Sequence, residues 1–182
     1  MTMQILDKLL YEAEEYEMVD WSAPLGFHPC DYGMNPVGTN TANHRGFYCE
    51  WEIADGKLKL ERMYVNDSDN NYPPINGDHA MNSAPPPFWG YHGYFNIDLD
   101  MSYTGVMAIG RIGRNSPFHI GGIRKRSSFA KVLEITFEDG WLKSVRDVSV
   151  KNFEEYTRQI EDECNQWADA IAAAAAEFSE EG

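Results

Sequence analysis

The chain has 182 residues and a formal net charge of −14, with 43% apolar and 13% aromatic residues. This length suits one domain with a hydrophobic core, and the composition excludes a disordered chain. The acidity disfavours plain electrostatic attraction to nucleic acid or to an anionic membrane. Three widely spaced cysteines favour a reducing compartment, so we expect a cytoplasmic protein without membrane contact.

The N-terminal segment carries its apolar side chains at helical spacing. From residue 3 to residue 17 they recur every three or four positions, and glutamates occupy the positions between them. This pattern predicts an amphipathic helix within residues 1–18. The following stretch, from Asp20 to Asn43, is rich in glycine, proline and asparagine, which predicts an ordered loop.

The clearest hairpin signal lies between residues 47 and 65. Apolar and polar side chains alternate on both sides of Asp55-Gly56. An Asp-Gly pair readily adopts the positive φ angles of a two-residue type I′ turn, so Ile53 should face Leu58 across the hairpin. A second hairpin is built alike around Asp139-Gly140, where alternating residues from 133 to 138 precede the turn.

Two further segments separate these hairpins. Residues 66–87 form a long polar and proline-rich connection, of the kind that is either functional or disordered. Residues 102–113 are rich in β-branched residues and predict a strand, in which Gly105 and Gly110 favour a bulge or a close backbone approach.

The C-terminal segment from about residue 152 to 178 has apolar residues at alternating steps of three and four, which predicts a long helix within residues 151–180. This helix either packs on or beside the sheet or serves as an arm for a homodimer. We therefore expect one α+β domain over residues 1–182. It consists of an N-terminal helix (1–18), a β-rich body with an antiparallel sheet (44–150) and the C-terminal helix.

A basic island lies inside this acidic chain. No acidic residue occurs between Asp100 and Glu134, and six Arg and Lys residues cluster there. Most flank glycines, which places them on loops or strand ends, where binding residues concentrate. Arginine forks suit phosphate or carboxylate groups, and Phe118 and Phe129 are candidates for stacking on bases. The candidate binding residues are Arg111, Arg114, Arg124, Lys125 and Arg126.

Two interpretations of the basic island stay open. Either its cations pair with the acidic terminal segments of the same chain, or they form one half of a binding surface with two signs of charge.

Three sequence blocks, RGFYCEWEIADGKLKLE, SYTGVMAIG and VLEITFEDGWLKSVRDVS, resemble a set of small uncharacterised bacterial and mobile-element proteins. The resemblance covers residues 45–61 and 102–149 and implies one mixed domain with an antiparallel sheet. It implies no catalytic residues.

The sequence contains no recognisable catalytic motif, and we expect no enzyme, cofactor or metal site. The leading hypothesis is a non-enzymatic protein that inhibits a nucleic-acid-handling protein, in the manner of phage anti-CRISPR proteins or toxin immunity proteins. Its partner is then a basic protein such as a nuclease or nucleoprotein. One alternative is a nucleic-acid or phosphate-ligand module that uses the loops of residues 111–131. Another is a metal-dependent hydrolase built on His92, Asp98 and Asp100.

Overall fold

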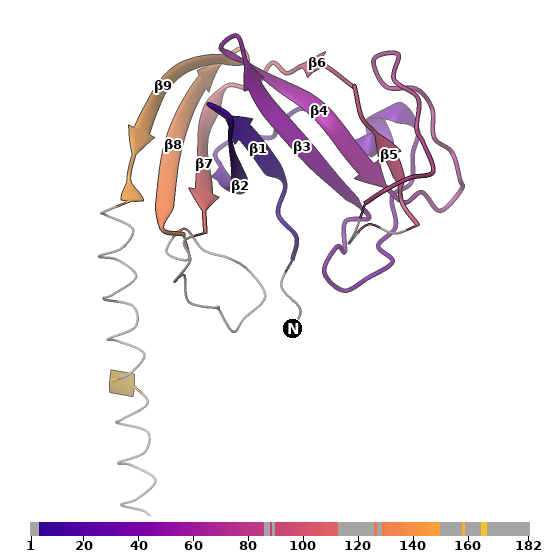
Figure 1. The fold of residues 1–182 in the computed structure, drawn as a ribbon, viewed down its shortest axis with the longest axis horizontal. Helices are drawn as coiled ribbons and strands as arrows, with labels where there is room; N and C mark the ends of the chain where they lie inside the picture. The colour runs from indigo at the N-terminus through magenta and orange to yellow at the C-terminus, as the bar shows by residue number, and fades with distance from the viewer. Residues whose placement is uncertain are drawn as a thin grey trace, which may run out of the picture.

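The computed structural model describes residues 4–85, 88, 90–112, 126, 129–149, 158 and 165–166. Nine strands and one short 3-10 helix are found in these residues (Figure 1). In chain order they are β1 (Lys8–Tyr11), β2 (Glu14–Trp21), η1 (Pro29–Tyr32), β3 (Phe47–Ala54), β4 (Lys57–Val65), β5 (His92–Tyr94), β6 (Leu99–Asp100), β7 (Gly105–Arg111), β8 (Lys131–Glu138) and β9 (Trp141–Asp147).

Seven of these strands close into a barrel. Their order around the ring is β3, β1, β2, β7, β8, β9 and β4, and β4 returns to pair with β3. The β1–β3 pair is parallel, whereas the other pairs of the ring are antiparallel. Closure removes the free edges that an open sheet exposes. The short strands β5 and β6 both pair with β4 outside this ring.

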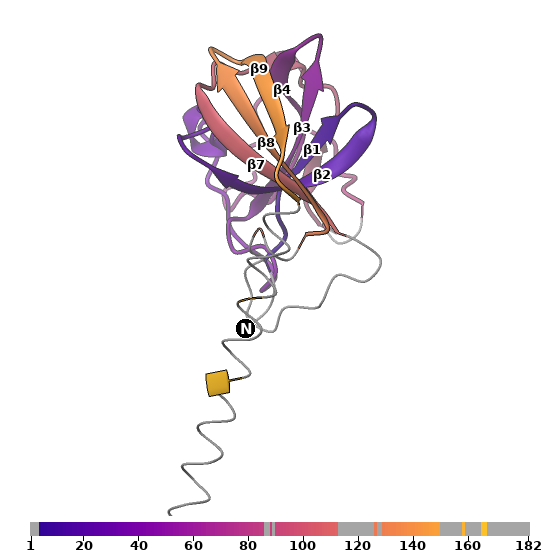
Figure 2. The ribbon, with the colours of Figure 1, turned by 90° about the vertical axis from the view of Figure 1, so that its left-hand side faces the viewer.

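Both Asp-Gly hairpins are confirmed, and their tips meet at the seam that closes the barrel (Figure 2). Asp55 and Gly56 have φ angles of 49° and 77°, and Asp139 and Gly140 have 49° and 76°. Ile53 faces Leu58 across the first hairpin, as expected. The Leu58 N–H donates to the Gly140 carbonyl oxygen at 2.9 Å, so the second tip is tied to the first.

The barrel is filled by the inward-facing side chains of alternate strand positions. Leu9, Met18, Leu60, Met107 and Ile135 are among the fully buried residues of this core. The predicted strand within residues 102–113 is β7. Its Gly110 allows the close approach that was expected, because a side chain there would collide with the ring of Phe129.

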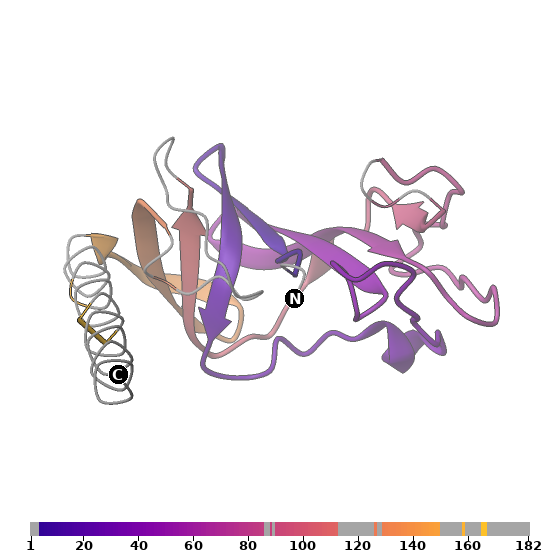
Figure 3. The same cartoon turned by 90° about the horizontal axis from the view of Figure 1, so that it is seen from below.

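A lobe of loops with β5 lies beside the barrel (Figure 3). It covers Tyr48 and Tyr64 on the outer side of β3 and β4, where Phe88 stacks on both rings at centroid distances of 4.6 and 5.3 Å. The connection predicted over residues 66–87 begins in this lobe. The buried carboxylate of Asp67 accepts the N–H groups of Asp69 and Asn71, which anchors its start.

The α+β prediction is wrong, because 47% of the described residues are strand and 7% are helical, and the described part holds no helix of seven or more residues. The predicted N-terminal helix is the hairpin of β1 and β2. Its turn consists of Glu12 and Ala13 at φ angles of 51° and 60°. Neither residue type favours positive φ, so the turn leaves no signal in the sequence. The pairing of β1 with β3 and of β2 with β7 overrides the helical spacing of the apolar residues. The helix predicted over residues 151–180 lies outside the described residues, apart from helical positions at 158, 165 and 166.

Candidate functional site

The described cations of the basic island pair with carboxylates of the same chain. Arg111 ends β7 and forms a 2.5 Å ion pair with Glu14 on β2. Lys131 starts β8 and lies 3.7 Å from the same carboxylate. Both cations also lie over the ring of Tyr16, at 5.9 and 5.7 Å from its centroid. Hydrogen bonds from Arg111 and from Tyr16 hold the pKa of Glu14 below its usual range.

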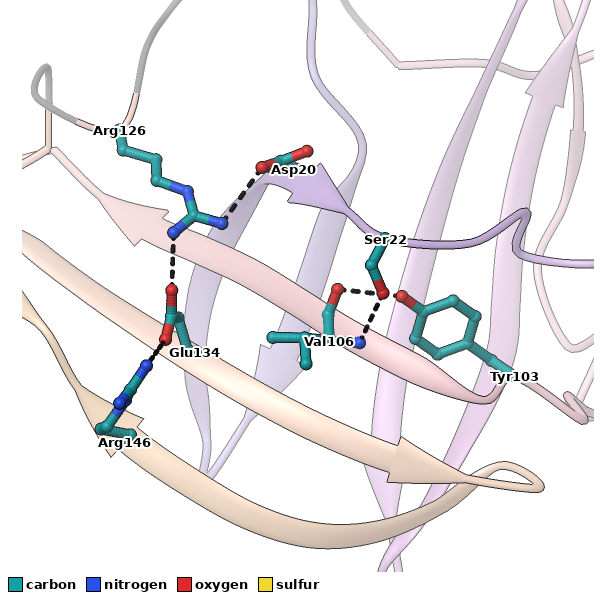
Figure 4. Close-up of polar contacts among 7 residues, drawn as sticks. All are labelled: Asp20, Ser22, Tyr103, Val106, Arg126, Glu134 and Arg146. Carbon is teal, nitrogen blue, oxygen red and sulfur yellow. Dashed lines mark hydrogen bonds and ion pairs between the residues drawn. The ribbon is translucent and has the colours of Figure 1, made fainter.

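Arg126 connects β2 with β8, as Figure 4 shows. Its guanidinium lies 3.0 Å from Asp20 and 2.6 Å from Glu134. Arg146 on β9 also contacts Glu134, and the hydrogen bonds from Arg146 and then Arg126 lower the pKa of that carboxyl. The charge of Arg126, like that of Arg111, is therefore balanced by carboxylates of the same barrel.

The remaining candidates, Arg114, Arg124 and Lys125, lie outside the described residues, so a binding role for the island stays a prediction. Of the two rings considered for base stacking, Phe118 also lies outside the described residues, and Phe129 is 4% exposed and packs against Gly110.

Carboxylates gather instead on the outer side of β2, β1, β3 and β4. The strand register places Glu17, Lys8, Glu50 and Arg62 in one row across these strands. The next row contains Glu15, Leu10 and Glu52, with Leu10 39% exposed between the two acids. With Glu61 on β4, and with Lys59 on β4 opposite Glu52, five carboxylates surround three cations. We call this set the glutamate face: Glu15, Glu17, Glu50, Glu52 and Glu61.

Two of the cations pair with members of the glutamate face. Lys8 pairs with Glu15 at 2.6 Å and Arg62 with Glu50 at 3.4 Å. Burial raises the pKa of Glu50, and the neighbouring Glu15 adds to this shift. Burial also raises the pKa of Glu61, followed by the charges of Glu52 and Asp98. Like charges that disfavour each other's ionised form create a negative potential that a cationic partner would relieve.

The residues considered for a metal-dependent hydrolase are held by other contacts. Asp98 pairs with Lys59 at 2.5 Å, and Asp100 pairs with Lys57 at 2.6 Å. His92 stacks on Tyr72 with ring centroids 3.7 Å apart, and burial lowers its pKa. No group of three or more His, Cys, Asp or Glu side chains able to hold a metal ion is found among the residues that the structure describes.

A cavity of about 320 Å³ is lined by the residue before β1, the end of β2, the loop after β2 and the start of β3. Its polar centre is Asp7, which precedes β1 and is 4% exposed. The Asp7 carboxylate lies 2.5 Å from Nη2 of Arg45 and 3.4 Å from Nη1. It also accepts the Cys49 N–H at 3.1 Å and the Trp51 indole N–H at 3.5 Å. These four contacts satisfy a carboxylate that would otherwise be costly to bury.

The walls of this cavity are mostly aromatic. They come from the end of β2, the loop that follows it and the start of β3: Trp21, Leu25, Phe27, His28, Phe47 and Trp51, together with Asp7, Arg45 and Cys49. Cys49 does not add a reactive thiolate, because burial and then the charge of Asp7 raise its pKa.

Sequence reasoning missed both the cavity and the glutamate face. Alternation of Asp7, Leu9 and Tyr11 is the signal that places an acid on the inner face of a strand, but it is visible only once β1 is recognised as a strand.

Comparison of the chain with family models, curated proteins and solved structures gives no match. The resemblance of the three sequence blocks to small mobile-element proteins stays a prediction. No helix among the described residues has the length and apolar character needed to cross a membrane.

Proposed function

We propose that this protein is a non-enzymatic binding protein that inhibits a nucleic-acid-handling protein by offering its glutamate face to a cationic surface. The observation that carries the proposal is the segregation of charge. Arg111 and Arg126 pair with carboxylates of the same barrel, whereas the glutamate face keeps five carboxylates against three cations, of which Lys59 also pairs with Asp98. The net charge of −14 adds a long-range attraction to the same kind of partner.

The rigidity of the glutamate face supports this function. Its members lie on neighbouring barrel strands, so their spacing is fixed by backbone pairing. A channel that binds nucleic acid presents Lys and Arg side chains to the phosphates, and a preorganised anionic surface competes for these side chains with little ordering cost. Leu10 adds an exposed apolar contact at the centre of the face.

Binding to a panel of purified basic nucleases, RNA-guided nucleases included, tests the proposal. Association with at least one of them is expected to weaken steeply between low and physiological salt, because screening shortens the reach of exposed charges to about 8 Å. The proposal is contradicted if no member of the panel binds, or if the binding that occurs is indifferent to salt.

A variant with four Glu→Gln changes identifies the surface that binds. The substitutions are Glu15→Gln, Glu50→Gln, Glu52→Gln and Glu61→Gln. A control variant removes the same formal charge from exposed acids elsewhere: Asp31→Asn, Asp69→Asn, Glu138→Gln and Asp139→Asn. We expect the first variant to lose most of the affinity and the control to keep most of it. Equal losses would assign binding to net charge and contradict a role for the face.

A further inference from the structure

We infer that the cavity around Asp7 is a binding site for a small aromatic carboxylate, a site independent of the glutamate face. Four aromatic rings, from Trp21, Phe27, Phe47 and Trp51, line its walls. A cavity with apolar walls and a few convergent polar groups is the usual form of a small-molecule site. Its volume equals roughly ten water molecules at ~30 Å³ each, which suits a ligand with one ring system.

The polar group that a ligand meets is Arg45. Its side chain is 39% exposed, whereas its partner Asp7 is 4% exposed and has four donors around it. Asp7 fixes one side of the guanidinium, and the ring of Phe47 lies 4.8 Å from the guanidinium carbon. An arginine has five N–H donors, so this anchored fork keeps donors for a second carboxylate.

His28 supplies a second donor beside the same ring. Its imidazole meets Phe47 edge-on, with centroids 5.0 Å apart. The His28 Nδ1 accepts the Cys30 N–H at 3.2 Å, so the neutral ring carries its proton on Nε2. Arg45 and His28 therefore both contact Phe47 and both carry hydrogen-bond donors, which matches a ligand with an acceptor group attached to a flat apolar body.

The charge of the site selects a monoanion. The charges of Asp7 and Arg45 sum to zero. A dianion such as phosphate is therefore attracted by the arginine but repelled by the nearby carboxylate, and the repulsion grows with the charge of the ligand. A carboxylate has one charge and the geometry of the fork, and the aromatic walls contribute through apolar burial and ring stacking. The inferred ligand class is thus an aromatic carboxylate, either a free acid or the C-terminal carboxylate of a chain that ends in an aromatic residue.

Titration of the full chain with matched probes, followed by the indole N–H signals in an NMR spectrum, tests this inference. Phenylacetate is expected to shift the signals of Trp21 and Trp51 with a Kd below about 5 mM, and to leave exposed Trp141 on β9 unchanged. Phenylacetamide, phenethylamine and inorganic phosphate should bind at least tenfold more weakly. A pentapeptide that ends in phenylalanine distinguishes the two sources of the carboxylate. Tighter binding of the pentapeptide than of phenylacetate would indicate a peptide terminus, and tighter binding of phenylacetate would indicate a free acid.

Variants connect the signal to the donors. Arg45→Lys keeps a cation beside buried Asp7, so the barrel folds, but it lacks the planar fork and should weaken phenylacetate at least tenfold. His28→Gln should weaken it about threefold, and Trp141→Leu should have no effect. The inference is overturned if phenylacetate fails to shift the two indole signals, if phenethylamine binds equally well, or if Arg45→Lys binds as the wild type does.

Discussion

Replacement of Gly140 by alanine should destabilise the barrel far more than the same replacement of Gly56. The two glycines occupy the same position of matching Asp-Gly turns, with φ angles of 76° and 77°. Their surroundings differ. A Cβ on Gly56 would lie 3.9 Å from the Trp141 ring, which is an ordinary contact, whereas a Cβ on Gly140 would overlap the carbonyl oxygen of Met101.

The expected magnitudes follow from these contacts. Alanine in the left-handed region costs roughly 1–2 kcal/mol at either turn. At Gly140 the backbone near Met101 must also move, which disturbs the Gly140 N–H bond to Tyr103 O (2.8 Å) and the Leu58 N–H bond to Gly140 O (2.9 Å). Each such bond contributes about 1 kcal/mol, so Gly140→Ala should cost about 3–4 kcal/mol in total.

Urea denaturation of both variants, monitored by tryptophan fluorescence, measures this difference. The free energy of unfolding should fall by about 2 kcal/mol more for Gly140→Ala than for Gly56→Ala, with unchanged m-values. Equal losses would refute the reasoning, because they would mean that the hairpin tips do not meet where the barrel closes.

Three further predictions concern buried and paired groups. Glu134→Gln should destabilise the protein at pH 7, because pairing lowers the folded-state pKa of Glu134. In stability-versus-pH curves this loss should shrink as the pH falls below the unfolded-state pKa of about 4.3, and it should vanish below the lowered folded-state pKa. Glu61→Gln should act oppositely, since its folded-state pKa is raised: the variant gains stability as pH rises above about 4.5 and matches the wild type in acid. Asp7→Ala should lower the free energy of unfolding by about 3 kcal/mol. In a double-mutant cycle, Asp7→Ala combined with Arg45→Met should lower it by at least ~1 kcal/mol less than the sum of the two single changes. Additive losses would contradict an interaction between Asp7 and Arg45.

The sequence predicted those parts of the fold that depend on local chemistry. Asp55-Gly56 and Asp139-Gly140 supply the positive φ that their turns require, so both hairpins are visible from composition and alternation. The hairpin of β1 and β2 is not visible in this way, since Glu12 adopts positive φ only because the flanking strands are held by β3 and β7. Misreading that hairpin as a helix also hid the closure of the barrel.

The candidate sites depend on contacts between distant residues. Arg126 meets Asp20 across 106 positions, and Asp7 meets Trp51 across 44, which no local pattern encodes. The absence of acidic residues between Asp100 and Glu134 revealed the basic island, but only the pairing of the strands shows that Arg111 has a partner in Glu14. The glutamate face likewise appears only when β1 lies between β2 and β3.

The central claim is that the arrangement of the glutamate face, and not net charge alone, inhibits a nucleic-acid-handling protein. Cleavage by the nuclease that binds best in the panel, titrated with wild type, the four-substitution face variant and the charge-matched control, tests it most directly. The account predicts stoichiometric inhibition by wild type and control, and at least tenfold weaker inhibition by the face variant. Equal inhibition by all three proteins, or cleavage that none of them reduces, would contradict it.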